Sequence, residues 1–201
     1  MTASALIGYV HPGTVRAEFM QSMLLTVRNG STEIEDVIGV QSGANISRAR
    51  NSLVAGFMES CESDWLWMVD TDMVFTADTL DRLVKSADAR HRPIVGGLCY
   101  RTGDGGEPVP VVFPASGLPD GLTCVDAVGA ACLLVHRNAF ARIADRYDPP
   151  APWFFETIED GHYYGEDVTF CRRAQRVRLP VYLNGDVRVG HVKSHIVGEV
   201  Q

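Results

Sequence analysis

The sequence predicts an α/β protein with a Rossmann-like architecture, in which helices flank a mostly parallel central sheet. In the first half, apolar segments of strand length alternate with segments of helical periodicity, an order typical of a doubly wound sheet. The chain of 201 residues, 46% hydrophobic and 21% charged, suits a folded domain with a substantial core. We therefore expect a single domain over residues 1–201.

Strands and helices should alternate through the first half. The expected strands are 5–10, 33–41, 64–70 and 92–100, and the expected helices are 15–29, 45–61 and 76–89. Thr14 and Thr76 are the expected N-caps of the first and third helices, because a threonine side chain can accept a hydrogen bond from the first helical turn. Gly30 is expected to end the first helix.

The second half of the sequence is less regular. Residues 101–121 are rich in glycine and proline, so we expect a loop that contacts substrate. The remaining expected elements are a strand at 125–136, helices at 137–147 and 165–177, an irregular aromatic segment at 148–164, and a strand pair at 180–192. This strand pair should turn at Asn184-Gly185.

Composition narrows the possible function. The formal net charge of −7 argues against nucleic acid as the partner, because phosphate binding draws on basic surface. Five irregularly spaced cysteines favour neither a disulfide framework nor a zinc site, so we expect a reduced, cytoplasmic protein. The apolar runs are far shorter than the ~20 residues of a transmembrane helix, and the first residues do not resemble a signal peptide.

Asp70 and Asp72 interrupt the apolar segment WLWMVDTDMVF at residues 65–75. Because strand side chains alternate, residues two apart share a face, so both carboxylates can point into one crevice. Two carboxylates with room for water and phosphate suit Mg²⁺ or Mn²⁺. The alternative is a turn in which the aspartates bond the backbone.

Two further clusters lie at expected helix starts. Arg48, Arg50 and Asn51 open the second helix, where an N-terminus with arginines is a natural anion site; the alternative is a solvated helix face. Glu166 and Asp167 open the helix at 165–177, where acidic residues also complement the helix dipole.

The order and spacing of these motifs resemble a GT-A-fold glycosyltransferase, in particular the family 2 type. The strand ending in DTD is preceded by NISRARNSLV and followed by GEDVTFCRRA and VGHV, so the resemblance covers residues 5–192. It implies a GT-A fold and a hexosyltransferase. The implied donor is a nucleotide sugar, with a UDP-sugar favoured, and the acceptor is a hydroxyl of a protein, glycan, lipid or small molecule.

The resemblance also implies a metal site. Asp70 and Asp72 would hold Mn²⁺ or Mg²⁺ on the donor diphosphate, with Asp70 near the ribose or metal and Asp72 as the more direct ligand. His191 in VGHV would be the third metal ligand, and His195 is a weaker candidate. Lys193 would approach the diphosphate.

The implied donor contacts come from three segments. Those to the nucleotide lie at the end of the first strand and the start of the second helix: Tyr9, His11, Arg48, Arg50 and Asn51. Gly129 would leave space for the donor sugar, and Asp126 would hold a sugar hydroxyl. A core strand that needs small residues for packing explains Gly129 equally well.

By the same resemblance, the pair Glu166-Asp167 supplies the catalytic base. Asp167 would deprotonate the acceptor hydroxyl, which attacks the anomeric carbon in line and inverts its configuration; related families that retain configuration have a similar segment, so the stereochemistry stays open. A base in this role needs hydrogen-bond reach and a pKa raised by partial burial. The aromatic residues Trp153, Phe154 and Phe155 are a candidate platform for the acceptor.

Two alternatives remain at the level of sequence. MVDTDMVF also fits the DxDx[TV] pattern of haloacid-dehalogenase-type phosphatases, in which Asp70 would be the nucleophile and Asp72 the acid/base, with Mg²⁺. That motif normally opens the chain, whereas two strand–helix units precede it here, and Lys85 lies too early for the lysine that the family requires. A non-catalytic sugar-nucleotide-binding protein would keep the DTD motif without needing a base.

Overall fold

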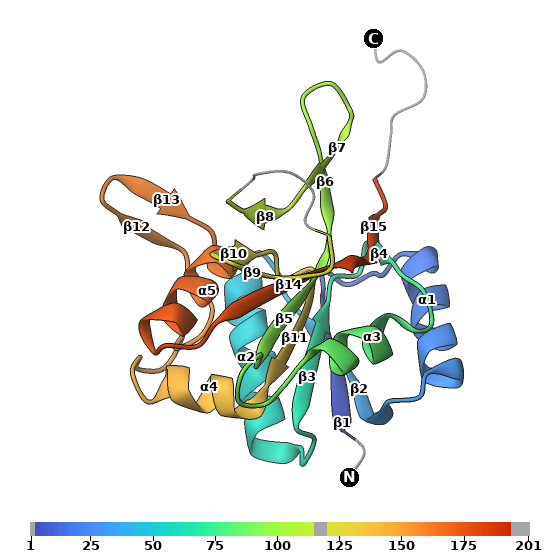
Figure 1. The fold of residues 1–201 in the computed structure, drawn as a ribbon, viewed down its shortest axis with the longest axis horizontal. Coiled ribbons are helices and arrows are strands. Elements are labelled where there is room, and N and C mark those ends of the chain that lie inside the picture. The colour runs from blue at the N-terminus through green and yellow to red at the C-terminus, as the bar shows by residue number, and fades with distance from the viewer. Residues whose placement is uncertain (1–2, 115–119, 194–201) are drawn as a thin grey trace.

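The computed structural model describes residues 3–114 and 120–193 and shows a seven-stranded sheet with helices on both faces (Figure 1). The helices are α1 (Ala17–Asn29), α2 (Ile46–Ser60), α3 (Thr79–Ser86), α4 (Arg137–Ala144) and α5 (Glu166–Arg176). In spatial order, the sheet contains β2 (Glu33–Gln41), β1 (Ser4–His11), β3 (Trp65–Val69), β11 (Cys132–His136), β5 (Ile94–Leu98), β14 (Val181–Arg188) and β9 (Leu122–Val125). The expected α/β class is confirmed.

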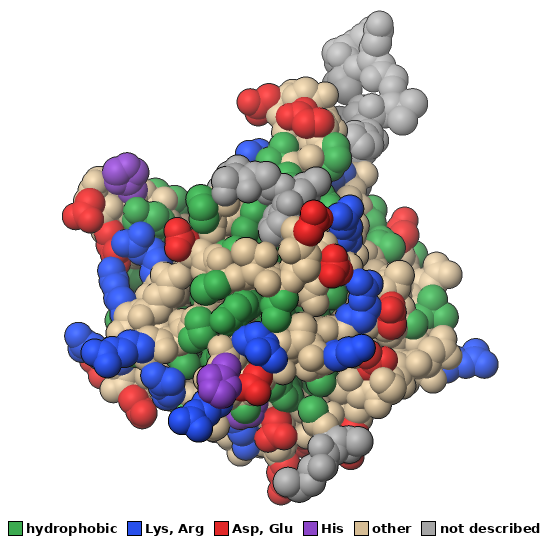
Figure 2. All heavy atoms as spheres, in the orientation of Figure 1, with side chains coloured by type: hydrophobic (Ala, Val, Ile, Leu, Met, Phe, Trp, Pro, Cys, Tyr) green, Lys and Arg blue, Asp and Glu red, His purple; other side chains and the backbone are tan. Residues whose placement is uncertain are grey.

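Short strands outside the central sheet form four pairs within the described ranges. These are β4 (Met73–Val74) with β15 (Gly190–His191), β6 (Tyr100–Thr102) with β7 (Pro108–Pro110), β8 (Val112–Phe113) with β10 (Ala127–Val128), and β12 (Thr157–Glu159) with β13 (His162–Tyr164). The hairpins β6–β7 and β12–β13 project from the side of the molecule that carries β4 and β15 (Figure 1). Acidic side chains gather at the tip of the β6–β7 hairpin (Figure 2).

The central sheet is mixed, which corrects the expectation of a mostly parallel sheet. β1 pairs in parallel with β2 and β3, and β14 with β5. In contrast, β11 runs antiparallel to both β3 and β5, and β9 runs antiparallel to β14. A parallel neighbour requires a long crossover, usually helical. The described residues between β5 and β11 contain no helix, and β11 returns antiparallel.

The sheet separates two apolar layers. Alternating side chains of β3 divide between them: Leu66 and Met68 pack with α2, α4 and α5, whereas Trp65, Trp67 and Val69 pack with α1 and α3. β3 is buried on both faces, which explains its continuous apolar sequence. The described part of the chain contains no helix with the length and apolar character needed to cross a membrane.

Two helix N-caps and one strand turn differ from those expected from the local sequence. The N-caps of α1 and α3 are Arg16 and Asp78 rather than Thr14 and Thr76. The Thr76 hydroxyl instead donates to the Asp78 carboxylate at 2.6 Å. Asn184-Gly185 does not turn a strand pair; β14 continues through it, with an irregular register against β5 beyond Asn184.

Asp81 on α3 fastens the connection between α1 and β2. Its carboxylate accepts hydrogen bonds from the backbone N–H groups of Ser31 (2.8 Å) and Thr32 (2.7 Å) and from the Thr32 hydroxyl (2.6 Å). Partial burial alone would raise the pKa of Asp81, but these hydrogen bonds outweigh it and leave the pKa below its ordinary value. The ionised carboxylate is therefore the form that stabilises this junction.

We expect Asp81→Asn to lower the free energy of unfolding by about 1–3 kcal/mol at pH 7, because an amide cannot accept all three hydrogen bonds. Since the folded pKa is depressed, the contribution is complete above the unfolded pKa of about 4 and is lost as the pH falls through the folded pKa. Urea unfolding of both proteins between pH 3 and pH 7 should show the difference shrinking at low pH. Asp104→Asn, at an exposed position in the β6–β7 turn, serves as the control; a difference independent of pH would contradict the assignment.

Candidate functional site

The candidate site lies where β1 and β3 end, beside the start of α2. A cleft of about 560 Å³ opens there, and its walls come from β1, the start of α2 and the three segments that follow β1, β2 and β3. The cleft is lined by Val10, Pro12, Thr14, Val15, Arg16, Ser42, Ile46, Asp70, Thr71 and Asp72. Asp70 and Asp72 both line this cleft, but from a turn between β3 and β4, closed by the Met73 N–H that donates to the Asp70 carbonyl oxygen at 3.1 Å, rather than from an alternating strand.

Arg50 joins three segments of the site. Its side chain is 4% exposed; one guanidinium nitrogen donates to Asp70 Oδ1 at 2.8 Å, and the other is paired with Glu166. Burial alone would lower the pKa of Arg50, but Asp70 and Glu166 outweigh it and raise this pKa. Burial raises the pKa of Glu166, and neighbouring Asp167 adds to this effect while Arg50 opposes it. Arg50 is consequently engaged with two carboxylates of the protein and also lines a cavity beside the cleft, so its expected contact with the nucleotide stays a prediction.

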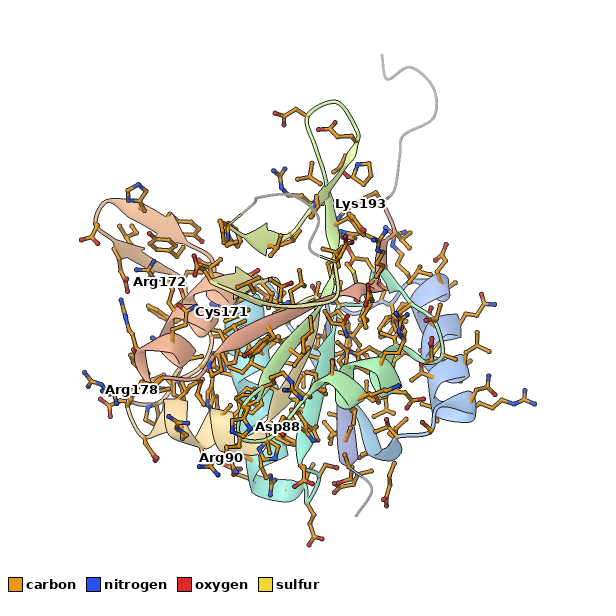
Figure 3. All side chains as sticks on the ribbon, viewed as in Figure 1. Asp88, Arg90, Cys171, Arg172, Arg178 and Lys193 are labelled. Carbon is orange, nitrogen blue, oxygen red and sulfur yellow. The ribbon has the colours of Figure 1, made fainter. Side chains whose placement is uncertain are left out.

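Asp72 and His191 form the second cluster. His191 Nε2 lies 2.7 Å from Asp72 Oδ2, and Lys193 Nζ contacts the same imidazole nitrogen and lies 3.7 Å from Asp72 Oδ2. Two antiparallel residue pairs between β4 and β15 hold them together, with His191 opposite Met73. Lys193 lies above β15, close to the base of β6 (Figure 3).

The protonation of His191 follows from its other ring nitrogen. Nδ1 lies 2.8 Å from the Tyr100 carbonyl oxygen, which can only accept, so Nδ1 carries the proton. The Asp72 carboxylate can only accept, so Nε2 contacts it at 2.7 Å as a donor when it too carries a proton, and a bound cation would take the place of that proton. A histidine that ligates a metal is oriented in the same way, with its second nitrogen donating to a carbonyl or carboxylate.

The pair Asp72 and His191 fits a divalent cation. Carboxylate oxygen and imidazole nitrogen suit Mn²⁺ well, and carboxylate oxygen suits Mg²⁺. No group of three or more His, Cys, Asp or Glu side chains converges in the described ranges as an all-protein metal cage would require. Two protein ligands leave positions for water and phosphate oxygens, as is usual for Mg²⁺. Asp70 lies in the same cleft, with its Oδ1 bound to Arg50.

A second cavity, of about 200 Å³, continues from the cleft toward α5. It shares Ile46 and Asp70 with the cleft, and Gly129, Asp167 and His191 also line it. A Cβ added to Gly129 would lie 3.1 Å from the Val111 side chain and 3.7 Å from Asp167 Oδ2. A side chain here would crowd Val111 and the space beside Asp167, which fits both the space expected for a donor sugar and close packing of the strand.

Asn51 does not face the cleft. Its amide donates to the carbonyl oxygens of Ser47 (2.7 Å) and Phe154 (2.6 Å), and its oxygen accepts from the backbone N–H groups of Trp153 (3.2 Å) and Phe154 (3.3 Å). The side chain is buried. Asn51 therefore fixes the segment that precedes α5, which corrects its expected contact with the nucleotide.

The other expected nucleotide residues lie away from the cleft lining. Val10 and Pro12 line it among the described residues, whereas Tyr9 and His11 do not. Side chains of β1 alternate, and the Tyr9 ring packs on Phe19 of α1 at a centroid distance of 5.4 Å. Arg48 is exposed on α2.

The expected aromatic platform is only partly present. Trp153 and Phe154 are buried, and Phe155 is exposed. Asp126 lies in a third cavity, of about 690 Å³, rather than beside Gly129. His195 falls outside the described residues.

Sequence reasoning missed the polar residues of loops. Thr14 and Ser42 line the cleft after β1 and β2, and the Tyr100 carbonyl orients His191. The signal for Thr14 and Ser42 was their place just beyond two strands, where ligands of such sheets bind. A carbonyl contact has no signal in side-chain chemistry.

Comparisons with known proteins show the fold but not a family. No protein-family model matches the sequence, and no curated protein matches it. The solved structure of A197 from STIV is similar, with a TM-score of 0.58 and 16% identity over 100% of this chain and 99% of that one. GalNAc-T7 with UDP, GalNAc and Mn²⁺ has a TM-score of 0.63 and 12% identity, over 95% of this chain and 43% of its own. GalNAc-T7 is a GT-A glycosyltransferase, and the likeness shows that this chain has a GT-A-like fold.

We expect Arg50→Leu to destabilise the protein by up to about 5 kcal/mol, because it leaves two carboxylates without their buried cation. Arg48→Leu, two residues earlier on the exposed side of α2, is the matched control and should change stability by about 0.5 kcal/mol or less. Urea unfolding measures both. Equal effects of the two substitutions would show that the guanidinium of Arg50 does not hold the site together.

Proposed function

We propose that this protein is a metal-dependent glycosyltransferase that moves a sugar from a nucleotide-sugar donor, with a UDP-sugar favoured, to an acceptor hydroxyl. The convergence of Asp72 and His191 at the rim of the cleft carries this proposal. The GT-A-like fold supports it, as does the solved structure of GalNAc-T7 with UDP and Mn²⁺. Bound Mn²⁺ or Mg²⁺ would neutralise charge on the leaving diphosphate.

The cleft of about 560 Å³ is the proposed nucleoside site. Thr14 and Ser42 offer hydroxyls to the ribose or base, and Val10 and Ile46 offer apolar walls. The diphosphate would then lie at Asp72, where the ammonium of Lys193 adds positive charge. These contacts orient the sugar into the cavity of about 200 Å³ beside Gly129.

Asp167 is the proposed catalytic base. Glu166 and Asp167 both line the cavity proposed for the sugar, but Glu166 is paired with Arg50. Asp167 Oδ1 accepts from the Val168 N–H at 2.7 Å. The acceptor hydroxyl gives its proton to Asp167 as its oxygen bonds to the anomeric carbon. The bond from that carbon to the diphosphate oxygen breaks with its electron pair, and the configuration inverts.

The phosphatase alternative gains no support from the comparisons. It needs Asp70 as a free nucleophile, but Asp70 Oδ1 accepts from the buried Arg50. A non-catalytic sugar-nucleotide-binding protein would share the donor site and is separated from the transferase by the role of Asp167.

Donor binding should depend on the metal and on Asp72. Calorimetric titration of UDP, GDP and CMP should show one nucleotide, UDP, binding with Mn²⁺ and losing affinity in EDTA. Asp72→Asn should weaken UDP binding by about 10-fold to 100-fold, because a ligand is lost at the metal. Asp148→Asn, in an exposed loop, is the control and should bind normally. Metal-independent binding, or normal binding by Asp72→Asn, would overturn the proposed donor site.

Transfer should depend on Asp167 without a change in donor affinity. Asp167→Asn should lower turnover by about 10²-fold to 10⁴-fold, because the amide cannot take the proton. UDP release from UDP-glucose, UDP-galactose and UDP-GalNAc measures turnover, and calorimetry measures UDP binding. Asp160→Asn, in the β12–β13 turn, is the matched control. Unchanged UDP release would exclude Asp167 as the base.

A further inference from the structure

A third cavity, of about 690 Å³, lies between α5, the β12–β13 hairpin and the strands β8 and β10. We call it the aromatic cup. Its lining includes Phe113, Asp126, Tyr163, Tyr164, Arg172 and Gln175. In Figure 1 the β12–β13 hairpin stands away from the body of the protein beside β8, with α5 below. Tyr163 and Phe113 in its lining are exposed, so the cup can be reached from solution.

The cup adjoins the proposed site of chemistry. Val111 and Asp167 line both the cup and the cavity of about 200 Å³ proposed for the donor sugar. The cup shares no lining residue with the nucleotide cleft among the described residues. A molecule in the cup can therefore present a hydroxyl to Asp167 without entering that cleft.

Aromatic rings form walls of the cup. Tyr163 and Phe113 are 64% and 44% exposed, which is unusual for large side chains that gather at one place. Arg172 stacks over the Tyr164 ring at 4.3 Å from its centroid and pairs with Glu159 at 2.8 Å. Arg172 lies at the base of the β12–β13 hairpin (Figure 3). The ring of Tyr164 is thus held in place before any ligand binds.

Polar groups are interspersed with these rings. Asp126 is exposed, and Gln175 donates to the Asp126 carbonyl oxygen at 2.8 Å. Asp126 and Asp167 supply carboxylates to the same cavity. Its volume lies in the range of small-ligand pockets, roughly 300–1,000 Å³. Aromatic faces for C–H surfaces, beside hydrogen-bonding groups for hydroxyls, are the complement of a sugar ring.

We propose that the aromatic cup binds the acceptor and that the acceptor is a carbohydrate. This inference rests on the proposed transferase function and names its second substrate class. The ring faces of Tyr163, Tyr164 and Phe113 would cover C–H groups of a pyranose, and Asp126 and Gln175 would bind its hydroxyls. A lipid chain would leave those polar groups unpaired, which is costly in an apolar complex.

Saturation-transfer NMR with the full chain, UDP and Mg²⁺ tests the proposal. The probes are methyl β-glucoside, methyl β-galactoside, methyl α-mannoside and methyl N-acetyl-β-glucosaminide, with a serine- and threonine-containing peptide for comparison. At least one glycoside should show transfer to its ring C–H protons. Tyr163→Ala and Phe113→Ala should each weaken its binding about tenfold.

Leu24→Ala is the matched control, because Leu24 is 64% exposed on α1 and lies outside the cup lining among the described residues. It should bind the glycoside normally, and thermal unfolding should confirm that all three variants fold. UDP binding by calorimetry, run in parallel, separates the two proposals. The proposal of a carbohydrate-binding cup is overturned if UDP binds normally but no glycoside gives a signal. It is also overturned if all three variants keep the signal, or if only the peptide binds. Loss of metal-dependent UDP binding overturns the donor site instead.

Discussion

The buried guanidinium of Arg50 is the interaction on which the site depends. It connects α2 to the end of β3 through Asp70 and to the start of α5 through Glu166, a residue 116 positions away in sequence. A charge in this position is stable only while both carboxylates stay in place. Because Asp167 follows Glu166 directly, the contact between Arg50 and Glu166 also fixes the position of Asp167, the proposed base, in the first turn of α5.

The mixed sheet explains why the small residues just before β11 lie beside Asp70 and Asp167. β11 enters antiparallel beside β3, so the residues that precede it arrive at the end where β3 finishes. The N–H of Asp70 donates to the Ala131 carbonyl oxygen at 3.0 Å, and Gly129 lies beside Asp167 in the adjoining cavity. Parallel strands alone would have needed a helical crossover to bring such a segment there.

Much of the fold could be predicted from sequence, because burial leaves a periodic pattern. The apolar run of β3 and its terminal aspartates located one wall of the site, and VGHV located His191 next to Asp72. Asn51 was misjudged because side-chain chemistry does not reveal burial. Its amide suits a nucleotide, but α2 turns it toward Phe154. The mixed sheet was missed because strand direction depends on the path of a long connection, which local patterns do not encode.

The ladder between β4 and β15 contains only two residue pairs, closed by the Val192 N–H, which donates to the Asp72 carbonyl oxygen at 2.8 Å. So small a ladder opens at low free-energy cost compared with the central strands. When it opens, His191 separates from Asp72, and the two proposed metal ligands no longer lie together. The apparent affinity for the proposed cation would therefore be the intrinsic affinity multiplied by the fraction of molecules in which β15 is docked. By linkage, a cation at this position also holds the end of β15 against the rest of the fold.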